Sequence, residues 1–353
     1  MDGRNFEKDN PFDKDNLDFY DKIICSDAKK DFSRLFLGLF MFNAIYVTIG
    51  TAVTIWLILV YGAEGAKGIT TNIYYAMIMG VAPMYCIALP FLVLFVKGVS
   101  VRKPKKQPFG IKSFIKLIPV AILLMTLGNY IGIFINSIIS AFKGGEIENS
   151  TANLLSASPT WLTIIMAVIL GPIVEEFIFR KLMIDKLAKY GYVTAILVSS
   201  LAFGLFHSNF YQFFYAMLVG ALLGYIYVKS GNWLLSVLMH AIINFYGGVI
   251  GDKITRITEE LIPLSEQYIA GTLTDTATFQ RYMTITQLYV YFHLAMLFIG
   301  GFVLFKAARR KAPILIDREK MSIPKGKRAS TIFVNTGAIL YLLSTAIMFI
   351  IEL

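Results

Sequence analysis

Long, uninterrupted blocks of apolar residues constrain this chain more than any other feature of its sequence. A helix of about 20 apolar residues can cross the roughly 30 Å hydrocarbon core of a bilayer. The strands of a membrane β-barrel instead alternate over about 9–11 residues. Because the blocks here are continuous, they predict an all-α, polytopic transmembrane helix bundle of about eight or nine spans. The predicted spans are residues 35–61, 73–96, 114–142, 160–183, 193–208, 211–228, 232–250, 285–306 and 331–351.

The composition supports a membrane protein and argues against nucleic acid as a partner. Only 16% of the 353 residues are charged and 56% are hydrophobic, whereas soluble domains are about 25% charged. The net charge of +10 comes from basic residues in the loops between apolar blocks. Such residues are typical of topology signals and contacts with anionic lipid headgroups. The two cysteines, Cys25 and Cys86, lie in different segments and indicate neither a disulfide framework nor a cysteine metal site.

The basic residues also predict the orientation of the chain in the cell membrane. If the N-terminus is cytoplasmic, 25 of the 33 Lys and Arg residues fall in inner segments and 5 in outer ones. This asymmetry favours an inner N-terminus and an outer C-terminus. The predicted organisation is a polar cytoplasmic segment at 1–34, transmembrane helices at 35–153, a helical core at 154–250, an extramembrane loop at 251–284 and transmembrane helices at 285–353.

Two adjacent glutamates and an arginine interrupt the apolar sequence of the fourth predicted span. Glu175, Glu176 and Arg180 lie in an otherwise apolar stretch, and a charge there costs about 2.5–3.5 kcal/mol on insertion scales, so it usually marks function. Glu176 and Arg180 are four residues apart and can pair along one helix face. Glu175 has no partner in its own helix, which makes it the better candidate for a general base. The simpler alternative is a structural ion pair that joins two helices.

Two of the three histidines lie in nearby spans. His207 lies near the end of the fifth span, and His240 and Asn244 are four residues apart in the seventh, so both face the same way. One intramembrane histidine is more often a helix-to-helix hydrogen bond than a catalyst, but polar clusters on three helices are harder to explain structurally. The third histidine, His293, lies outside these clusters and is predicted to be structural or interfacial.

The predicted turn between the fourth and fifth spans provides a geometric check. Glu175 lies 16 residues before Gly191, and His207 lies 16 residues after it. At about 1.5 Å per residue, both are roughly 24 Å from the turn. An antiparallel hairpin would therefore place Glu175 and His207 at the same depth.

The pattern resembles a known family over about residues 155–250. Glu-Glu-x-x-x-Arg, Phe-x-x-x-His and His-x-x-x-Asn follow one another on successive apolar helices. They are similar to the motifs of the CPBP family, the CAAX-protease and bacteriocin-processing (Abi) intramembrane endopeptidases. The resemblance implies that Glu175 and His207 activate a water and that His240 and Asn244 stabilise the oxyanion. The second Glu and the Arg of the first motif would support the site.

The need for a metal stays open at this stage. The family is often described as metalloproteases, and Glu175, His207 and His240 could bind zinc and leave a position for water. The pattern is not His-Glu-x-x-His, and a metal-free glutamate mechanism fits equally well.

The predicted function is hydrolysis of a peptide bond in a membrane-associated peptide or protein, as in CAAX-protein trimming or peptide-precursor processing. The competing hypotheses are a non-catalytic membrane immunity or scaffold protein and a proton-coupled transporter, in which buried Glu, His and Arg would form a relay. The side from which substrate arrives is also open. The predicted cytoplasmic turn at Gly191 places the site nearer the outer leaflet, whereas CAAX proteases act from the cytoplasm. Either the topology is inverted, or substrate approaches from mid-membrane or from outside.

Overall fold

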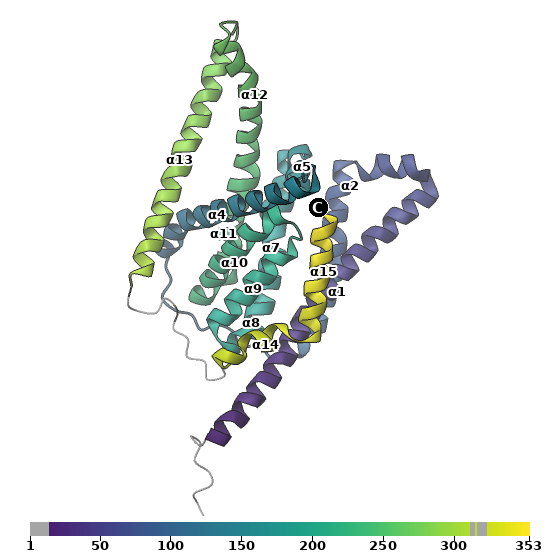
Figure 1. The fold of residues 1–353 in the computed structure, drawn as a ribbon, viewed down its shortest axis with the longest axis vertical. Coiled ribbons are helices and arrows are strands. Elements are labelled where there is room, and N and C mark those ends of the chain that lie inside the picture. Colours follow the sequence, from purple (N-terminus) through teal and green to yellow (C-terminus); the bar gives the residue numbers. More distant parts are fainter. Residues whose placement is uncertain (1–13, 311–314, 316–322) are drawn as a thin grey trace, which may run out of the picture.

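The computed structural model describes residues 14–310, 315 and 323–353, and this part of the chain forms helices and no strand (Figure 1). The α-helices are α1 (Lys14–Thr70), α2 (Ile73–Pro83), α3 (Leu89–Phe95), α4 (Ile111–Lys143), α5 (Ser150–Ala157), α6 (Thr160–Thr163), α7 (Gly171–Glu176), α8 (Asp185–Leu187), α9 (Tyr192–Phe206), α10 (Phe210–Ser230), α11 (Trp233–Asn244), α12 (Gly251–Ile269), α13 (Thr276–Ala308), α14 (Arg328–Phe333) and α15 (Thr336–Ile351). Four π-helical turns interrupt them: η2 (Met84–Ala88), η4 (Ile164–Leu170), η5 (Phe177–Ile184) and η7 (Phe245–Ile250). Short 3-10 turns complete the chain at η3 (Val96–Gly98), η6 (Ala188–Tyr190) and η8 (Lys325–Lys327).

The predicted polytopic helical architecture is confirmed. Within the described residues, seven helical segments are long and apolar enough to cross a membrane, and a bent pair makes an eighth. That pair is α14 and α15, which meet at an angle of 64°. The predicted fifth span is the 15-residue helix α9, shorter than a full crossing. The predicted polar segment 1–34 is helical from Lys14 onward, and its first 13 residues lie outside the described part.

Helices α9 and α10 pack together in the centre of the bundle, and α4 packs against α10 and α13 (Figure 1). The contact between α4 and α10 depends on glycine. A Cβ atom at Gly128 would collide with the backbone of Tyr215, and one at Gly132 would collide with the carbonyl oxygen of Phe210. Small residues spaced by four allow two membrane helices to approach at backbone distance. The sequence of α4 therefore fixes which of its faces lies against the N-terminal half of α10.

Replacing Gly128 with alanine is expected to lower the free energy of unfolding by about 1–3 kcal/mol, because the methyl group overpacks a backbone contact. Thermal unfolding of the detergent-solubilised protein measures this loss. Gly50→Ala is the matched control, since Gly50 is also helical but no atom lies within 4 Å of its added Cβ. Equal stability of the two variants would contradict the proposed role of the α4–α10 contact.

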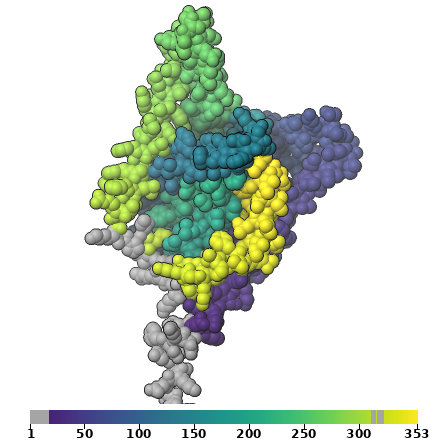
Figure 2. All heavy atoms as spheres, viewed as in Figure 1, coloured from purple at the N-terminus to yellow at the C-terminus, as the bar shows by residue number. Residues whose placement is uncertain are grey.

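The segment 251–284 is not the loop that its polarity suggests. It forms α12 and the start of α13, a helical hairpin that projects from the bundle (Figures 1 and 2). The turn uses Gly271, whose φ is +70°, and Asp275 caps α13 by accepting a hydrogen bond from the Thr278 backbone N–H at 2.9 Å. That hydrogen bond also holds the pKa of Asp275 below its ordinary value. Ring stacking of Tyr268 on Phe279, at 5.1 Å between centroids, joins the two helices. The loop prediction was wrong because polar composition concealed this helical pairing.

Candidate functional site

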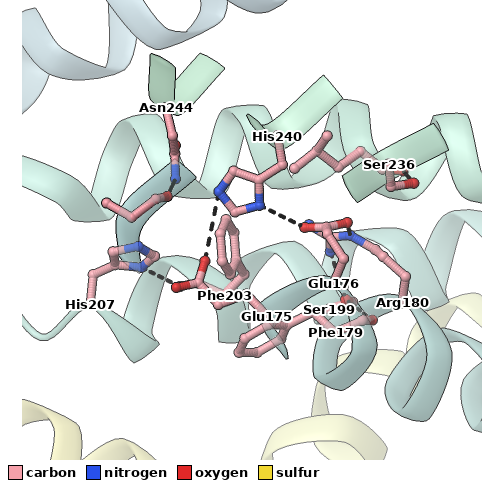
Figure 3. Close-up of polar contacts among 12 residues, drawn as sticks. Glu175, Glu176, Phe179, Arg180, Ser199, Phe203, His207, Ser236, His240 and Asn244 are labelled. Atoms are coloured by element: carbon pink, nitrogen blue, oxygen red, sulfur yellow. Dashed lines mark hydrogen bonds and ion pairs between the residues drawn. The ribbon is translucent and has the colours of Figure 1, made fainter. Parts of the chain in front are cut away.

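The structure brings the six predicted site residues together in the centre of the bundle (Figure 3). The two glutamates end α7, and Arg180 follows in η5. His207 caps the C-terminal end of α9, and α11 carries His240 and Asn244. The chain reverses between η5 and α9 at Gly191, whose φ of +111° suits glycine. The hairpin geometry expected from the sequence is therefore present, and Glu175 and His207 lie side by side.

Helix α7 is a short α-helical segment between two π-helical turns, η4 and η5. A π turn shifts backbone hydrogen bonds from i−4 to i−5, and such turns occur often at functional sites. One carbonyl in η4, that of Ala167, accepts a hydrogen bond of 2.8 Å from the Asn244 side-chain amide. This bond ties α11 to the segment that carries the glutamates. Only one of the two Asn244 amide hydrogens is used in it, so the other is available to the site.

Glu176 and Arg180 form a completely buried ion pair. The Arg180 Nε donates to Glu176 Oε2 at 2.8 Å and the Nη2 donates to Oε1 at 3.3 Å. Both side chains have no exposed surface. The third guanidinium nitrogen donates to Ser199 Oγ at 3.0 Å, and the Phe203 ring lies 5.3 Å from the Arg180 Cζ atom. These contacts satisfy the charges of the pair and fix the Glu176 carboxylate in one orientation.

His240 links the buried pair to the second carboxylate. Its Nδ1 lies 3.1 Å from Glu176 Oε1, and its Nε2 lies 3.7 Å from Glu175 Oε2 (Figure 3). An ionised carboxylate accepts hydrogen bonds but cannot donate them, so Nδ1 carries a hydrogen. His240 can then donate from Nε2 as well only in its doubly protonated form. In that state its charge and that of Arg180 balance the two glutamates.

The tautomer of His207 follows from a backbone contact. Its Nδ1 lies 2.9 Å from the carbonyl oxygen of Phe203, one helical turn earlier. Since a carbonyl oxygen only accepts, Nδ1 is the donor, and Nε2 is left for the site. The Phe203 ring also packs edge-on against both imidazoles, with centroid distances of 5.0 Å to His207 and 5.6 Å to His240. Phe203 therefore orients both histidines.

Glu175 differs from its neighbour because part of its side chain reaches open space. Its side chain is 21% exposed, whereas that of Glu176 is 0% exposed. Its carboxylate lies between the two imidazoles, and its charge acts on His207 (Figure 3). Gly171 leaves room beside it: a Cβ there would lie 3.8 Å from Glu175 Oε1 and 4.0 Å from the Tyr85 hydroxyl. An accessible carboxylate next to two proton carriers is the arrangement that general-base catalysis requires.

In the ranges that the structure describes, no group of three or more His, Cys, Asp or Glu side chains is arranged to hold a metal ion. The trio Glu175, His207 and His240, considered above for zinc, does not meet that arrangement, and no step of the mechanism is assigned to a metal.

Three contributors were not singled out from the sequence: Ser199, the Ala167 carbonyl and Tyr85. Ser199 bridges Arg180 to the Phe179 carbonyl oxygen, which its Oγ contacts at 2.6 Å. No sequence signal separates these residues from ordinary apolar-helix residues. His293 lies outside the site, as expected, with its Nδ1 2.7 Å from the Tyr246 hydroxyl and its Nε2 3.4 Å from Thr126 Oγ1.

Comparisons with known proteins match the part of the chain that carries these residues. Residues 157–246 match the family model described as type II CAAX prenyl endopeptidase, Rce1-like. A protein of Bacillus subtilis (strain 168), described as "Putative membrane peptidase YdiL", is 24% identical over 212 residues, which cover 57% of this chain and 83% of YdiL. No solved structure shows a significant match. The matched residues include all three motifs, so over this core the chain matches the Rce1-like type II CAAX prenyl endopeptidase (CPBP) family of membrane peptidases.

Proposed function

We propose that this protein is an intramembrane endopeptidase that hydrolyses a peptide bond in a membrane-associated peptide or protein. The single observation that carries the proposal is the position of Glu175. It is the accessible carboxylate of the site, and it lies between two imidazoles whose other nitrogens are fixed by hydrogen bonds. The family name suggests a substrate with a prenylated CAAX end.

In the proposed reaction, Glu175 and His207 orient a water molecule and Glu175 accepts its proton. The water oxygen then attacks the carbonyl carbon of the scissile bond. His207 is suited to this role because its Nδ1–H is held by the Phe203 carbonyl and its Nε2 faces the site. A fixed base in a water-poor cavity contributes about 10²–10⁴-fold to such a step.

Negative charge then develops on the carbonyl oxygen of the tetrahedral intermediate. The free Asn244 amide hydrogen and the His240 Nε2–H are the donors proposed to stabilise it. Glu176 and Arg180 act indirectly, because Glu176 orients His240 and Arg180 orients Glu176. The intermediate collapses when the proton taken up by Glu175 passes to the amine nitrogen and the C–N bond breaks.

The test compares membrane peptides, by mass spectrometry, in cells that carry the native chain or Glu175→Gln at matched expression. A peptide product is expected with the native chain and not with the variant, because glutamine cannot accept the proton of water. Such a product also identifies the substrate and the scissile bond. Identical peptide profiles, together with an unchanged cellular phenotype, would refute the proposal and favour a non-catalytic scaffold.

A further inference from the structure

Tyr85 brings a hydroxyl group into the neighbourhood of Glu175. It lies in η2, the π turn that follows α2. A ring contact between Tyr74 and Trp161, with 6.4 Å between centroids, places α2 beside α6, which leads into the segment that carries the glutamates. Tyr85 itself lies outside residues 157–246, the part of the chain that matches the family.

The space beside Gly171 separates the Tyr85 hydroxyl from the proposed base. A Cβ atom at Gly171 would lie 3.8 Å from Glu175 Oε1 and 4.0 Å from the Tyr85 hydroxyl oxygen. The charge of Glu175 also acts on the Tyr85 hydroxyl. A larger side chain at this position would enter the space between the two oxygens, and glycine leaves it clear. The hydroxyl and the proposed base therefore line one small space.

The Tyr85 hydroxyl is free to bind an incoming group. Among the described residues it has no hydrogen-bond partner, and its oxygen retains accessible surface. A tyrosine hydroxyl is neutral at physiological pH and carries one hydrogen to donate. That hydrogen is therefore available to an acceptor that arrives with the substrate.

A proline brings the Asn244 amide to the same part of the helix. The next residue that could donate to the Ala167 carbonyl oxygen across the π turn is Pro172, which has no N–H. The Asn244 amide donates to that oxygen instead, at 2.8 Å. Ala167, Gly171 and Glu175 are spaced by four, so they lie near one side of this segment. The amide and the tyrosine hydroxyl therefore meet along one strip of the helix.

We propose that Tyr85 is a further catalytic residue, whose hydroxyl donates a hydrogen bond to the oxyanion that forms on the scissile carbonyl. The inference rests on the proposed endopeptidase function. The attacking water needs no such donor, because Glu175 and His207 Nε2 accept its two hydrogens. The carbonyl oxygen, in contrast, gains negative charge in the transition state, and a tyrosine hydroxyl is a suitable donor to it. Tyr85 is thus the third oxyanion donor, beside His240 and Asn244.

The experiment measures hydrolysis by Tyr85→Phe in lipid vesicles, with an internally quenched, S-farnesylated CAAX peptide as the probe. Phenylalanine keeps the ring and removes only the hydroxyl. The value of kcat is expected to fall about 10²-fold with KM nearly unchanged, because the hydrogen bond strengthens as the oxyanion forms. The unfolding temperature is expected to stay the same, since the hydroxyl has no partner among the described residues.

Tyr46→Phe is the matched control. Tyr46 is also half-buried in a membrane helix, α1, but no charged side chain of the described residues acts on its hydroxyl. Its replacement is expected to leave kcat and KM unchanged. Glu175→Gln serves as the reference for the rate without the proposed base.

The rates of these variants separate the two proposals. If the native chain is faster than Glu175→Gln and Tyr85→Phe keeps the native kcat, Tyr85 is not an oxyanion donor and the endopeptidase function stands. A higher KM at constant kcat would make Tyr85 a substrate-binding residue, and a clear loss of stability would make it structural; either result contradicts the proposal. If the native chain and Glu175→Gln are equally slow, the endopeptidase function fails for this class of substrate, and the role of Tyr85 fails with it.

Discussion

Purified Glu175→Gln is expected to hydrolyse substrate about 10²–10⁴-fold more slowly than the native chain, with KM nearly unchanged. Glutamine keeps the shape of the side chain but cannot take a proton from water, and general-base catalysis contributes a factor of this size. The loss should appear in kcat, because the base acts in the transition state and adds little to ground-state binding. Single-turnover hydrolysis of a quenched peptide in vesicles measures it.

Stability separates this prediction from a structural role for Glu175. The side chain is 21% exposed, and its carboxylate pairs with His240 at 3.7 Å, so Glu175→Gln should unfold at nearly the native temperature. Glu175→Asp is the informative companion variant, because it keeps the base but withdraws it by one methylene. It should retain more activity than Glu175→Gln. Equal activity of the native chain and both variants would contradict the assignment of Glu175 as the base.

Much of the candidate site could be predicted because its geometry is local. The i, i+4 spacings of Glu176 with Arg180 and of His240 with Asn244 determine shared helix faces. The equal distances of Glu175 and His207 from Gly191 determine a shared depth. What the spacing could not show is the direction of each hydrogen bond. The links from Arg180 to Ser199 and from Asn244 to Ala167 depend on π turns, and no residue pattern marks these turns.

The apolar membrane helices of the fold were predictable from the sequence, whereas the polar helix α12 was not. Continuous apolar blocks locate the membrane helices, because every backbone polar group in lipid has to be satisfied within the segment. Helix α12 escaped prediction because its Asp, Glu, Lys and Arg residues resemble those of a loop. The predicted fifth span, residues 193–208, nearly coincides with α9, but apolar composition alone does not show whether so short a helix crosses the membrane.

Arg180→Met is expected to destabilise the protein by about 3–5 kcal/mol, the range for removing one partner of a buried ion pair. Methionine fills the volume but leaves the Glu176 carboxylate, which has no exposed surface, without its two guanidinium hydrogen bonds. Reversible unfolding in mixed micelles measures the loss. The matched control is Arg256→Met, which removes the i, i+4 ion pair of Arg256 with Asp252. The N···O distance of that pair is 2.9 Å, against 2.8 Å for Arg180 with Glu176, but the Arg256 side chain is 49% exposed. Exposed pairs contribute at most about 1 kcal/mol.

A double variant separates the contribution of the Arg180 charge to stability from the contribution of its packing. In Glu176→Gln/Arg180→Met the unpaired buried charge is gone, and the glutamine carbonyl oxygen can still accept from His240 Nδ1. Most of the lost stability should therefore return, because replacing both partners of a buried pair is often neutral. Activity should not return to the same extent, because a neutral amide oxygen holds the His240 Nδ1–H more weakly than a carboxylate does. If the double variant is as unstable as Arg180→Met alone, the arginine stabilises the bundle through its contacts with Ser199 and Phe203, and the ion pair contributes little.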